Sequence, residues 1–157
     1  MARFMRKGTT KVYFVPTITS VSAATVAEVT AGTELGPELA DVSGFAFTNN
    51  PISTPDMDNQ FVSQITGEDT ADQSSLTFYD DDTSSTIKAA LAKGTAGYVL
   101  FYYAGLAGAT PAANDEYEAW PVTVSAAPRL FSAGNEAAQF RVDFAITAVP
   151  VEGTTAA

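Results

Sequence analysis

The sequence predicts a mainly β fold: an antiparallel β-sandwich or barrel with one packed α-helix. Aromatic residues make up 11% of the 157 residues, a content that favours strands. The stretch from Glu136 to Val149 alternates apolar and polar residues, which is the period of a strand. Only one segment has a strong helical pattern. No internal repeat or linker divides the chain, so residues 1–157 are predicted to form one domain.

Apolar and aromatic runs in the first half of the chain predict four strands. Lys11 to Ile18 is the first, and Pro16 should end it because proline cannot donate to a ladder. Between it and the second strand, a short helix is expected to begin at Thr25 or Ser22 and to end at Gly32. The other strands are expected at LADVSGFAF with Phe45 and Phe47 on one face, at QFVSQI with Phe61 and Ile65 on one face, and at SSLTFYD with Leu76 and Phe78 inward.

Two segments between these strands are predicted to be loops. Residues 49–59, NNPISTPDMDN, contain two prolines and several Asn and Asp residues, a composition typical of a long irregular loop. GEDTADQSS is expected to form an acidic loop.

The convincing helix is predicted from Thr83 to Lys93. Ile87, Ala90 and Leu91 share one helical face. Asp82 or Thr83 is the predicted N-cap, and Gly94 follows where a C-terminal cap belongs. Lys88 and Lys93 lie toward the end, where positive charge suits the helix dipole.

The second half of the chain predicts three more strands. GYVLFYYAG is strongly apolar, as expected of a buried strand, and EYEAWPVTVSAA places Trp120, Val122 and Val124 on one face. The third is the alternating strand from Glu136 to Val149. Its predicted inner face holds Phe140, Val142, Phe144 and Ile146, and its outer face holds Gln139, Arg141, Asp143 and Thr147.

Composition excludes several functional classes. The formal net charge of -10 argues against a nucleic-acid-binding protein, which must neutralise phosphates with Lys and Arg. The chain has no Cys and no His, which removes thiolate nucleophiles, disulfides, imidazole bases and nearly all zinc and iron sites. No apolar run approaches the ~20 residues of a membrane helix, and the start does not resemble a signal peptide. We therefore expect a soluble protein without membrane anchoring.

Clusters of carboxylates are the best candidates for chemistry, and each has a simpler explanation. Asp80, Asp81 and Asp82 could bind a cation, but consecutive residues at the end of a strand point alternately and seldom converge on one ion. Solvation and helix capping explain them better. Glu68, Asp69 and Asp72, with Asp80, could supply the paired carboxylates of a glycosidase, and Glu116 and Glu118 flank Tyr117. Because no GxSxG elbow or phosphate-binding glycine loop occurs either, we expect no catalysis and no cofactor.

The polar face of the strand from Glu136 to Val149 has two interpretations. It could be the solvated face of an ordinary antiparallel sheet, or it could meet a neighbouring subunit. Gln60, Gln64 and Thr123 extend the same short polar theme on other predicted strands.

The sequence resembles the major tail tube proteins of long-tailed, siphovirus-type bacteriophages, particularly those of actinobacterial hosts. The resemblance covers nearly the whole chain, and the order and spacing of its segments carry it. These segments are MARFMRKGTTKVYFVPTI, AEVTAGTELGPELADVSGFAF, PISTPDMDNQFVSQITGEDT, SSLTFYDD, ALAKGTAGYVLF, AWPVTV and FSAGNEAAQFRVDFAIT.

The resemblance implies a structural role in the virion tail, after synthesis in the host cytoplasm. Such proteins form hexameric rings that stack into a tube, and strands of each subunit join a ring-wide β-barrel through which DNA is ejected into the host. A helix packs outside the sandwich, which would here be the helix from Thr83 to Lys93. The implied partners are further copies of the chain, the tape-measure protein and DNA in the lumen, and the tail terminator and tail-tip proteins.

Specific residues are expected to serve these roles. The predicted lumen-facing set is Gln60, Gln64, Thr123, Gln139, Arg141 and Asp143. The N-terminal arm (1–10) and the loop 49–59 are the candidates for ring-to-ring contacts, and residues 150–157 form a C-terminal tail. The expected contact residues are Arg3, Phe4, Arg6, Lys7, Asn50, Pro51, Ile52, Pro55, Asp56 and Met57.

The chain as a whole is strongly acidic, but the charge expected for the lumen is close to zero. An acidic protein suits a conduit for DNA, but the predicted lumen set is nearly neutral, and Arg141 should pair with Asp143 or with a neighbour's carboxylate. Two other functional classes stay open at this point. One is a capsid decoration or host-binding β-sandwich, which should expose an aromatic patch, and the other is a sugar-active enzyme.

Overall fold

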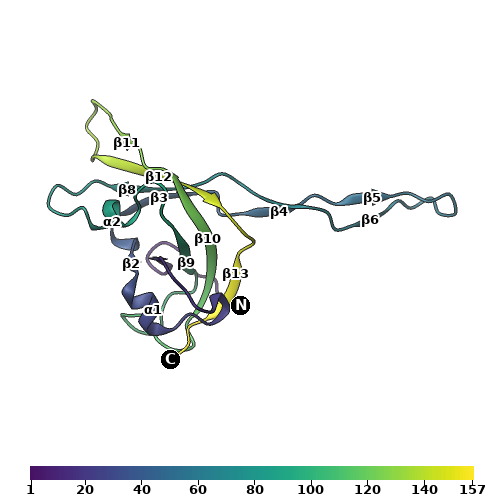
Figure 1. Cartoon of the computed structure of the whole chain (residues 1–157), viewed down its shortest axis with the longest axis horizontal. Coiled ribbons are helices and arrows are strands. Elements are labelled where there is room, and N and C mark those ends of the chain that lie inside the picture. The colour runs from purple at the N-terminus through teal and green to yellow at the C-terminus, as the bar shows by residue number, and fades with distance from the viewer.

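One large antiparallel sheet forms the body of the protein (Figure 1). The computed structural model describes residues 1–157. The strands follow the order β2-β1-β9-β10-β12-β8-β3, with β11 paired to β12 and β13 paired to β10. Their bounds are β1 Lys11–Val15, β2 Thr33–Glu34, β3 Leu39–Ser43, β8 Ser74–Tyr79, β9 Ala96–Tyr102, β10 Glu116–Ala126, β11 Arg129–Leu130, β12 Gln139–Ile146 and β13 Val151–Thr154. The mainly β prediction is confirmed.

The predicted alternation of β10 and β12 builds the main core. Trp120, Val122 and Val124 of β10 and Phe140, Val142 and Phe144 of β12 are all buried, as predicted. Leu76 and Phe78 of β8 join them. Burial of such side chains contributes roughly 1.5–3 kcal/mol each, so this core is the main source of stability.

A second, smaller core covers the other face of β1, β9 and the first half of β10. Tyr13 and Val15 of β1 point into it, whereas their neighbours Val12 and Phe14 point into the main core. These strands are therefore buried on both faces, which explains why GYVLFYY reads as a continuous apolar run.

Helix α1 (Val26–Ala31) supplies the cover for this second core through Val29. It begins with a capping box, in which the Thr25 hydroxyl accepts the Glu28 N–H and the Glu28 carboxylate accepts the Thr25 N–H. Thr25 as N-cap and Gly32 as the end of the helix are both confirmed. The end of the chain lies beside it, because Ala156 accepts the Val26 N–H. Two short 3-10 turns, η1 (Val21–Ala23) and η2 (Gly36–Glu38), complete this region.

Helix α2 (Thr86–Ala90) lies within the predicted range but is shorter than predicted. Its N-cap is Ser85, without a side-chain cap bond, so the predicted caps Asp82 and Thr83 are wrong. The reason is a competing local turn, in which Asp81 accepts both the backbone N–H and the hydroxyl of Thr83. Its buried residue Ile87, like Leu91 just after the helix, joins the main core, so α2 packs on the side of the sheet opposite Arg141 and Asp143.

The predicted loop 49–59 is half of a long two-stranded arm, so its assignment as an irregular loop is wrong. β4 (Phe47–Asn49) pairs with β7 (Asp69–Ala71), and β5 (Ile52–Thr54) pairs with β6 (Ser63–Ile65). This arm, residues 46–73, projects far from the body (Figure 1). The predicted strand QFVSQI is only in part present, because β6 begins at Ser63 and leaves Phe61 outside it, and both Phe61 and Ile65 are exposed.

The chain leaves the body for the arm at a sharp turn. Gly44 and Phe45 both have positive φ, at 81° and 55°, so the predicted single strand through Phe45 and Phe47 is broken there. Phe45 turns into the main core, whereas Phe47 stays at the arm root and is 46% exposed. The predicted C-terminal tail is largely strand β13, which extends the sheet beside β10.

No helix has the length and apolar character that crossing a membrane requires.

Candidate functional site

On β8, β12 and the second half of β10, the face of the sheet opposite the main core has no other element packed on it. The side chains on this face are mainly polar. The register places Arg141 opposite Thr77 and Asp143 opposite Ser75, with Thr123 opposite Ala145 on the other side of β12. All of these side chains lie on the face opposite the main core. The structure thus brings four of the predicted lumen residues onto one surface, hereafter the polar face: Thr123, Gln139, Arg141 and Asp143.

Gln60 and Gln64, the other two predicted lumen residues, are not on the polar face. Gln64 belongs to β6 in the arm, and Gln60 lies near the arm tip. Their side chains have the same short polar character as the other four, but residue type alone does not show which strands share a sheet.

The two charges that β12 places on the polar face are paired. Arg141 Nε lies 2.8 Å from Asp143 Oδ1, and Nη2 lies 3.4 Å from Oδ2. The side chain of Arg141 is 43% exposed and that of Asp143 only 13%. The predicted pair within one strand is therefore present, and it neutralises Arg141. Asp41 of β3, in register with Thr77, adds one carboxylate without an ion-pair partner at the edge of this face.

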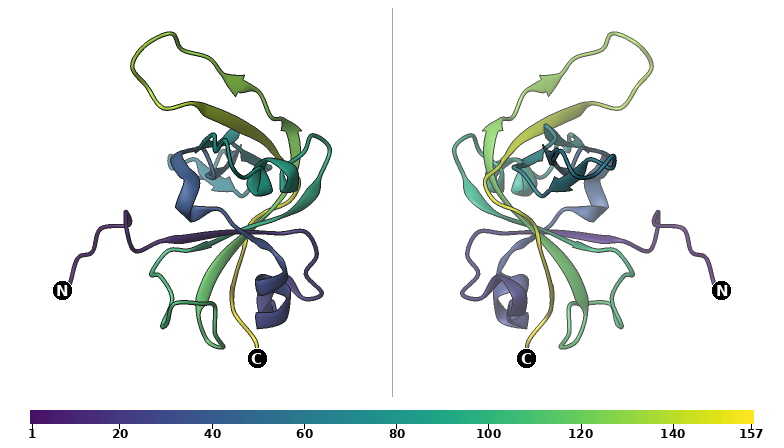
Figure 2. Two further views of the ribbon diagram at one scale, coloured as in Figure 1. Left: turned by 90° about the vertical axis from the view of Figure 1, so that its left-hand side faces the viewer. Right: turned by 90° about the vertical axis from the view of Figure 1, so that its right-hand side faces the viewer.

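The sheet has free edges on either side of the polar face. β3 pairs only with β8, so its other edge carries unpaired backbone groups. On the far side, β11 pairs only with β12 and leads into a protruding loop (Figure 2). Leu130 at the end of β11 is 41% exposed, and Phe131 after it is 95% exposed. Free edges are templates for pairing with another chain.

The arm is fixed to the body by buried contacts at its root. The Phe45 N–H donates to the Ser74 hydroxyl at 2.9 Å, and that hydroxyl donates to the Asp72 carbonyl. The Phe45 ring lies against Phe101 and Trp120 in edge-on geometry. A root buried in this way holds the arm in one direction.

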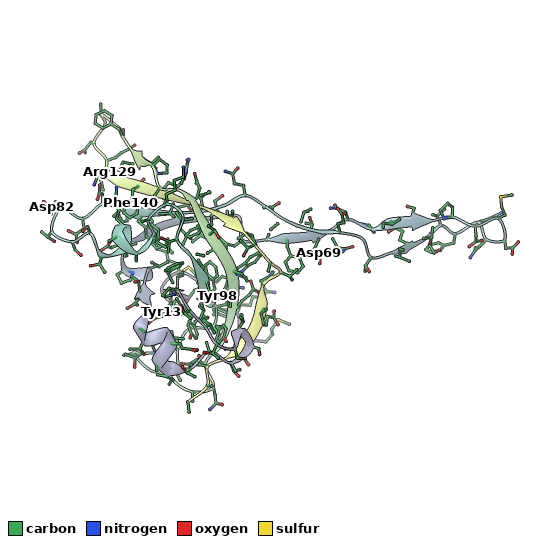
Figure 3. All side chains as sticks on the ribbon, in the orientation of Figure 1. Tyr13, Asp69, Asp82, Tyr98, Arg129 and Phe140 are labelled. Carbon is green, nitrogen blue, oxygen red and sulfur yellow. The ribbon has the colours of Figure 1, made fainter.

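The arm itself exposes apolar and acidic groups together (Figure 3). Ile52 and Ile65 face each other across the strands and are 53% and 56% exposed. The loop at its far end, residues 55–62, is hereafter the arm tip, and its Met57 is fully exposed. The charged residues of the arm are all acidic: Asp56, Asp58, Glu68, Asp69 and Asp72.

The N-terminal segment has the opposite charge. Four of the eight Lys and Arg residues of the chain are Arg3, Arg6, Lys7 and Lys11. The Arg6 guanidinium stacks 4.4 Å from the centre of the Tyr103 ring, and the Thr10 hydroxyl donates to the Tyr103 carbonyl at 3.0 Å. Residues 1–5, including Arg3 and Phe4, extend away from the body (Figure 2).

The carboxylates considered for chemistry have structural partners or lie apart. The Asp81 carboxylate accepts the Thr83 N–H, and this hydrogen bond lowers the pKa of Asp81. Asp80 Oδ2 lies 3.6 Å from Arg129 Nε. Glu68, Asp69 and Asp72 lie on the arm, away from Asp80. No three Asp, Glu, His or Cys side chains are arranged to hold a metal ion.

Glu118 links two aromatic side chains through hydrogen bonds. Its carboxylate accepts hydrogen bonds from Trp120 Nε1 at 2.6 Å and from the Tyr103 hydroxyl at 3.2 Å. Burial, followed by the Glu118 charge, raises the pKa of Tyr103 to about 12. The adjacent Tyr117 points to the second core, where its hydroxyl accepts the Ala24 N–H and donates to the Val21 carbonyl.

A family profile described as phage tail tube protein matches residues 1–157. The chain belongs to this family. It is a structural component of the virion tail. No curated protein matches the chain in sequence.

Two solved structures are similar to this tail tube protein in fold. A chain in the 6-fold symmetrised anti-feeding prophage baseplate has a TM-score of 0.61 and 7% sequence identity, and 97% of each chain is covered. A chain in a native gene transfer agent virion has a TM-score of 0.51 and 13% identity, covering 81% of this chain and 91% of that one. At these identities, the likeness concerns the fold.

Proposed function

We propose that copies of this chain form hexameric rings and that these rings stack into the tail tube through which DNA is ejected. The observation that carries the proposal is the uncovered polar face. A sheet with one face in a core and the other polar is what a ring-wide barrel needs, because the polar side can line a wet channel. The fold similarity to a chain of a baseplate with 6-fold symmetry supports six as the number.

The free edges support a closed ring. β3 lies on one side of the polar face and β11 on the other, so joining one copy's β3 to the next copy's β11 repeats the same heterologous contact. Such a contact closes into a ring when its rotation allows. Leu130 and Phe131 would be covered in that joint, and six copies would leave neither the β3 edge nor the β11 edge free.

The polar face has no unpaired cation, which suits a channel for DNA. A cation free to bind phosphates would retard sliding, and Arg141 is already paired with Asp143. Thr123 and Gln139 add uncharged polar groups to the proposed lumen, beside Ser75 and Thr77 of β8. The tape-measure protein and DNA are the proposed lumen partners, and the terminator and tip proteins are the proposed end partners.

The arm and the N-terminal segment are the proposed ring-to-ring contacts. Both project from the body, and both expose apolar side chains that a partner would cover, including Phe4, Ile52 and Met57. Arg3, Arg6 and Lys7 on one segment complement Asp56 on the other, and Asn50, Pro51 and Pro55 lie along the arm. The proposal gives the chain an assembly role and no catalytic one.

Negative-stain electron microscopy of the purified protein tests this function. Rings or tubes with a central channel are the expected result. Particles that stay monomeric at every protein concentration and salt condition, with the fold intact by circular dichroism, would contradict it.

A further inference from the structure

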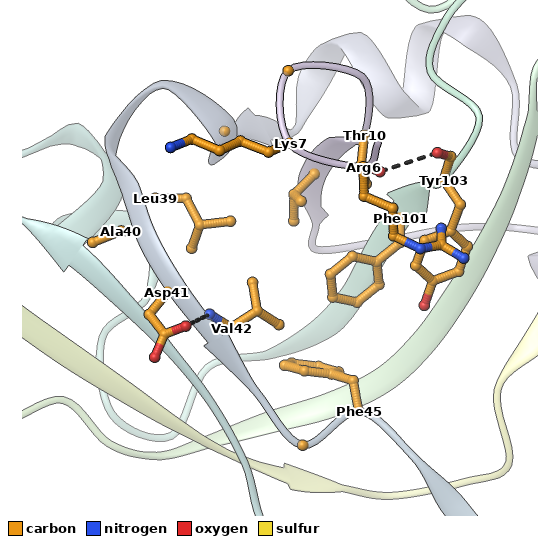
Figure 4. A pocket seen from close by; sticks show the side chains of 14 residues that line it. Arg6, Lys7, Thr10, Leu39, Ala40, Asp41, Val42, Phe45, Phe101 and Tyr103 are labelled. Carbon is orange, nitrogen blue, oxygen red and sulfur yellow. Dashed lines mark hydrogen bonds between the residues drawn. The ribbon is translucent and has the colours of Figure 1, made fainter. Parts of the chain in front are cut away.

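A groove opens where the curled sheet fails to close, between β3 and the N-terminal segment that precedes β1 (Figure 4). Its volume is about 620 Å³. Leu39, Val42, Phe45 and Phe101 form an apolar floor, and Arg6 and Lys7 stand at its rim. We refer to these residues, together with Ala40 on β3, as the groove.

The exposure of Val42 shows that the groove is an unfilled part of the core. Val42 pairs in register with Leu76, which is fully buried, and so points to the same side of the sheet. Yet Val42 is 42% exposed, because no strand of the same chain lies beside the outer edge of β3. Covering this apolar floor is favourable at roughly 25 cal/mol per Å² of apolar surface.

The rim of the groove is mainly basic and held in place. Arg6 is fixed by its stack on Tyr103, and Lys7 follows in the same turn. Asp41 also lines the groove, but its carboxylate accepts the N–H of Val42 on its own strand. A ligand segment that is apolar and acidic therefore fits this surface.

The arm tip has that chemistry. Met57, Phe61 and Val62 are 101%, 73% and 49% exposed, and Asp56 and Asp58 flank Met57. Two local turns shape the tip, in which Asp56 accepts the Asp58 N–H and Asn59 accepts the Phe61 N–H. A tip with preformed turns loses less conformational entropy on binding than a free segment.

The tip cannot reach the groove of its own chain. The arm leaves the body next to the groove, at Gly44 and Phe45, and carries the tip to the far end of the molecule (Figure 1). The contacts of Phe45 and Ser74 hold that direction. The occupant must then be the tip of a second copy, and because donor and acceptor surfaces differ, the contact propagates from copy to copy.

We propose that the arm tip of a second copy fills the groove, with Met57 on the apolar floor and Asp56 and Asp58 facing Arg6 and Lys7. This inference rests on the proposed assembly into tubes, and it assigns the surface that receives the arm. Each copy gives one tip and receives one tip, so the contact ties every subunit to two others.

Crosslinking tests the proposal, because the chain contains no natural cysteine. A Met57→Cys chain and an Ala40→Cys chain are assembled together and treated with a short bis-maleimide. The expected product is a covalent dimer of the two variants in tubes. A matched control pairs Met57→Cys with Thr30→Cys, an exposed position on α1, which covers the second core away from the groove, and should give at least tenfold less dimer.

The outcomes separate this inference from the proposed function. Tubes that form without the Met57–Ala40 dimer overturn the groove assignment and leave the tube role standing. A chain that never assembles overturns both.

Charge exchange gives a second readout that leaves the Arg6–Tyr103 stack intact. Lys7→Glu or Asp56→Lys alone should raise the protein concentration needed for assembly by about tenfold. The two changes on the same chain should restore assembly toward the original concentration. Failure of the double variant to recover, with circular dichroism unchanged, contradicts the proposed pairing.

Discussion

Arg141 and Asp143 lie two residues apart on β12 and pair at 2.8 Å on the polar face, whereas Phe140 and Val142 beside them are buried. One strand thus separates two tasks by alternate positions. Its apolar side chains hold the body of the subunit together, and its polar side chains form a surface that the subunit leaves uncovered. The predictions below follow from this division and from the arm that projects beyond it.

The division predicts a large contrast between neighbouring substitutions on β12. Phe140→Ala should lower the free energy of unfolding by about 3–5 kcal/mol, because the ring is buried and stacked on Phe78. Arg141→Ala should cost no more than about 1 kcal/mol, since the pair is partly exposed and screened by solvent. Urea unfolding measures both, and equal losses would contradict the assignment of faces.

The arm predicts a variant that folds but does not assemble. A Cβ at Gly67 would lie 1.9 Å from the carbonyl oxygen of Asn50, so Gly67→Ala must distort the arm between its two ladders. The atoms that surround Gly67 belong to the arm and not to the body. The melting temperature of the body should therefore stay unchanged while tube formation falls. Gly108→Ala is the matched control, because nothing lies within 4 Å of its added Cβ. Normal tubes from Gly67→Ala would show that assembly does not need the arm.

The two helix starts predict different responses to alanine. Thr25→Ala removes the capping box of α1 and should cost about 1 kcal/mol of stability. Ser85→Ala at the start of α2 removes no cap bond and should have little effect. Thermal unfolding compares the two, and a larger loss from Ser85→Ala would be inconsistent with the cap geometry.

Alkaline pH should destabilise the subunit. Burial and the Glu118 carboxylate raise the pKa of Tyr103 to about 12, and burial also raises the pKa of Tyr102 and Tyr117. An unfolded tyrosine releases its proton near pH 10, so the unfolded state binds fewer protons above that pH. Stability is therefore full below pH 10 and falls between pH 10 and about 12.

The matched variant for this prediction is Tyr103→Phe. Melting temperatures from pH 9 to pH 12 should fall less steeply for Tyr103→Phe than for the unchanged protein, although Tyr13, Tyr102 and Tyr117, whose pKa values are also raised, remain. Equal slopes for the two proteins would mean that folding does not raise the pKa of Tyr103.

The sequence was most informative where side chains alternate between a core and an open face. Phe140, Val142 and Phe144 carry that signal, and so do Leu76 and Phe78, because burial selects apolar residues at every second position. The pairing of Arg141 with Asp143 also follows from spacing, since residues i and i+2 of a strand share a face.

The arm left no such signal. Its strands have no buried face, so Ile52, Gln64 and Ile65 need not alternate, and Pro51 and Pro55 read as loop residues. Uncharged residues such as Thr48 and Thr70 lie opposite each other in its ladder. Because they are far apart in sequence, the local sequence pattern does not show that they pair. The prediction that Gln60 and Gln64 face the lumen rested on residue type, which does not show which strands share a sheet.

Helix α2 and the groove needed three-dimensional information of other kinds. A side-chain turn between Asp81 and Thr83 displaced the helix start, which residue preferences alone could not decide. The groove joins Arg6 and Lys7 to Val42 and Phe101, residues that are far apart in sequence and meet because the sheet curls without closing.

A cryo-electron microscopy reconstruction of the assembled protein tests the central claim most directly. The account predicts a central channel lined by the polar face, with Thr123, Gln139, Arg141 and Asp143 of every subunit turned toward the axis. A reconstruction in which this face is turned outward, or is buried against another subunit away from the channel, would contradict it.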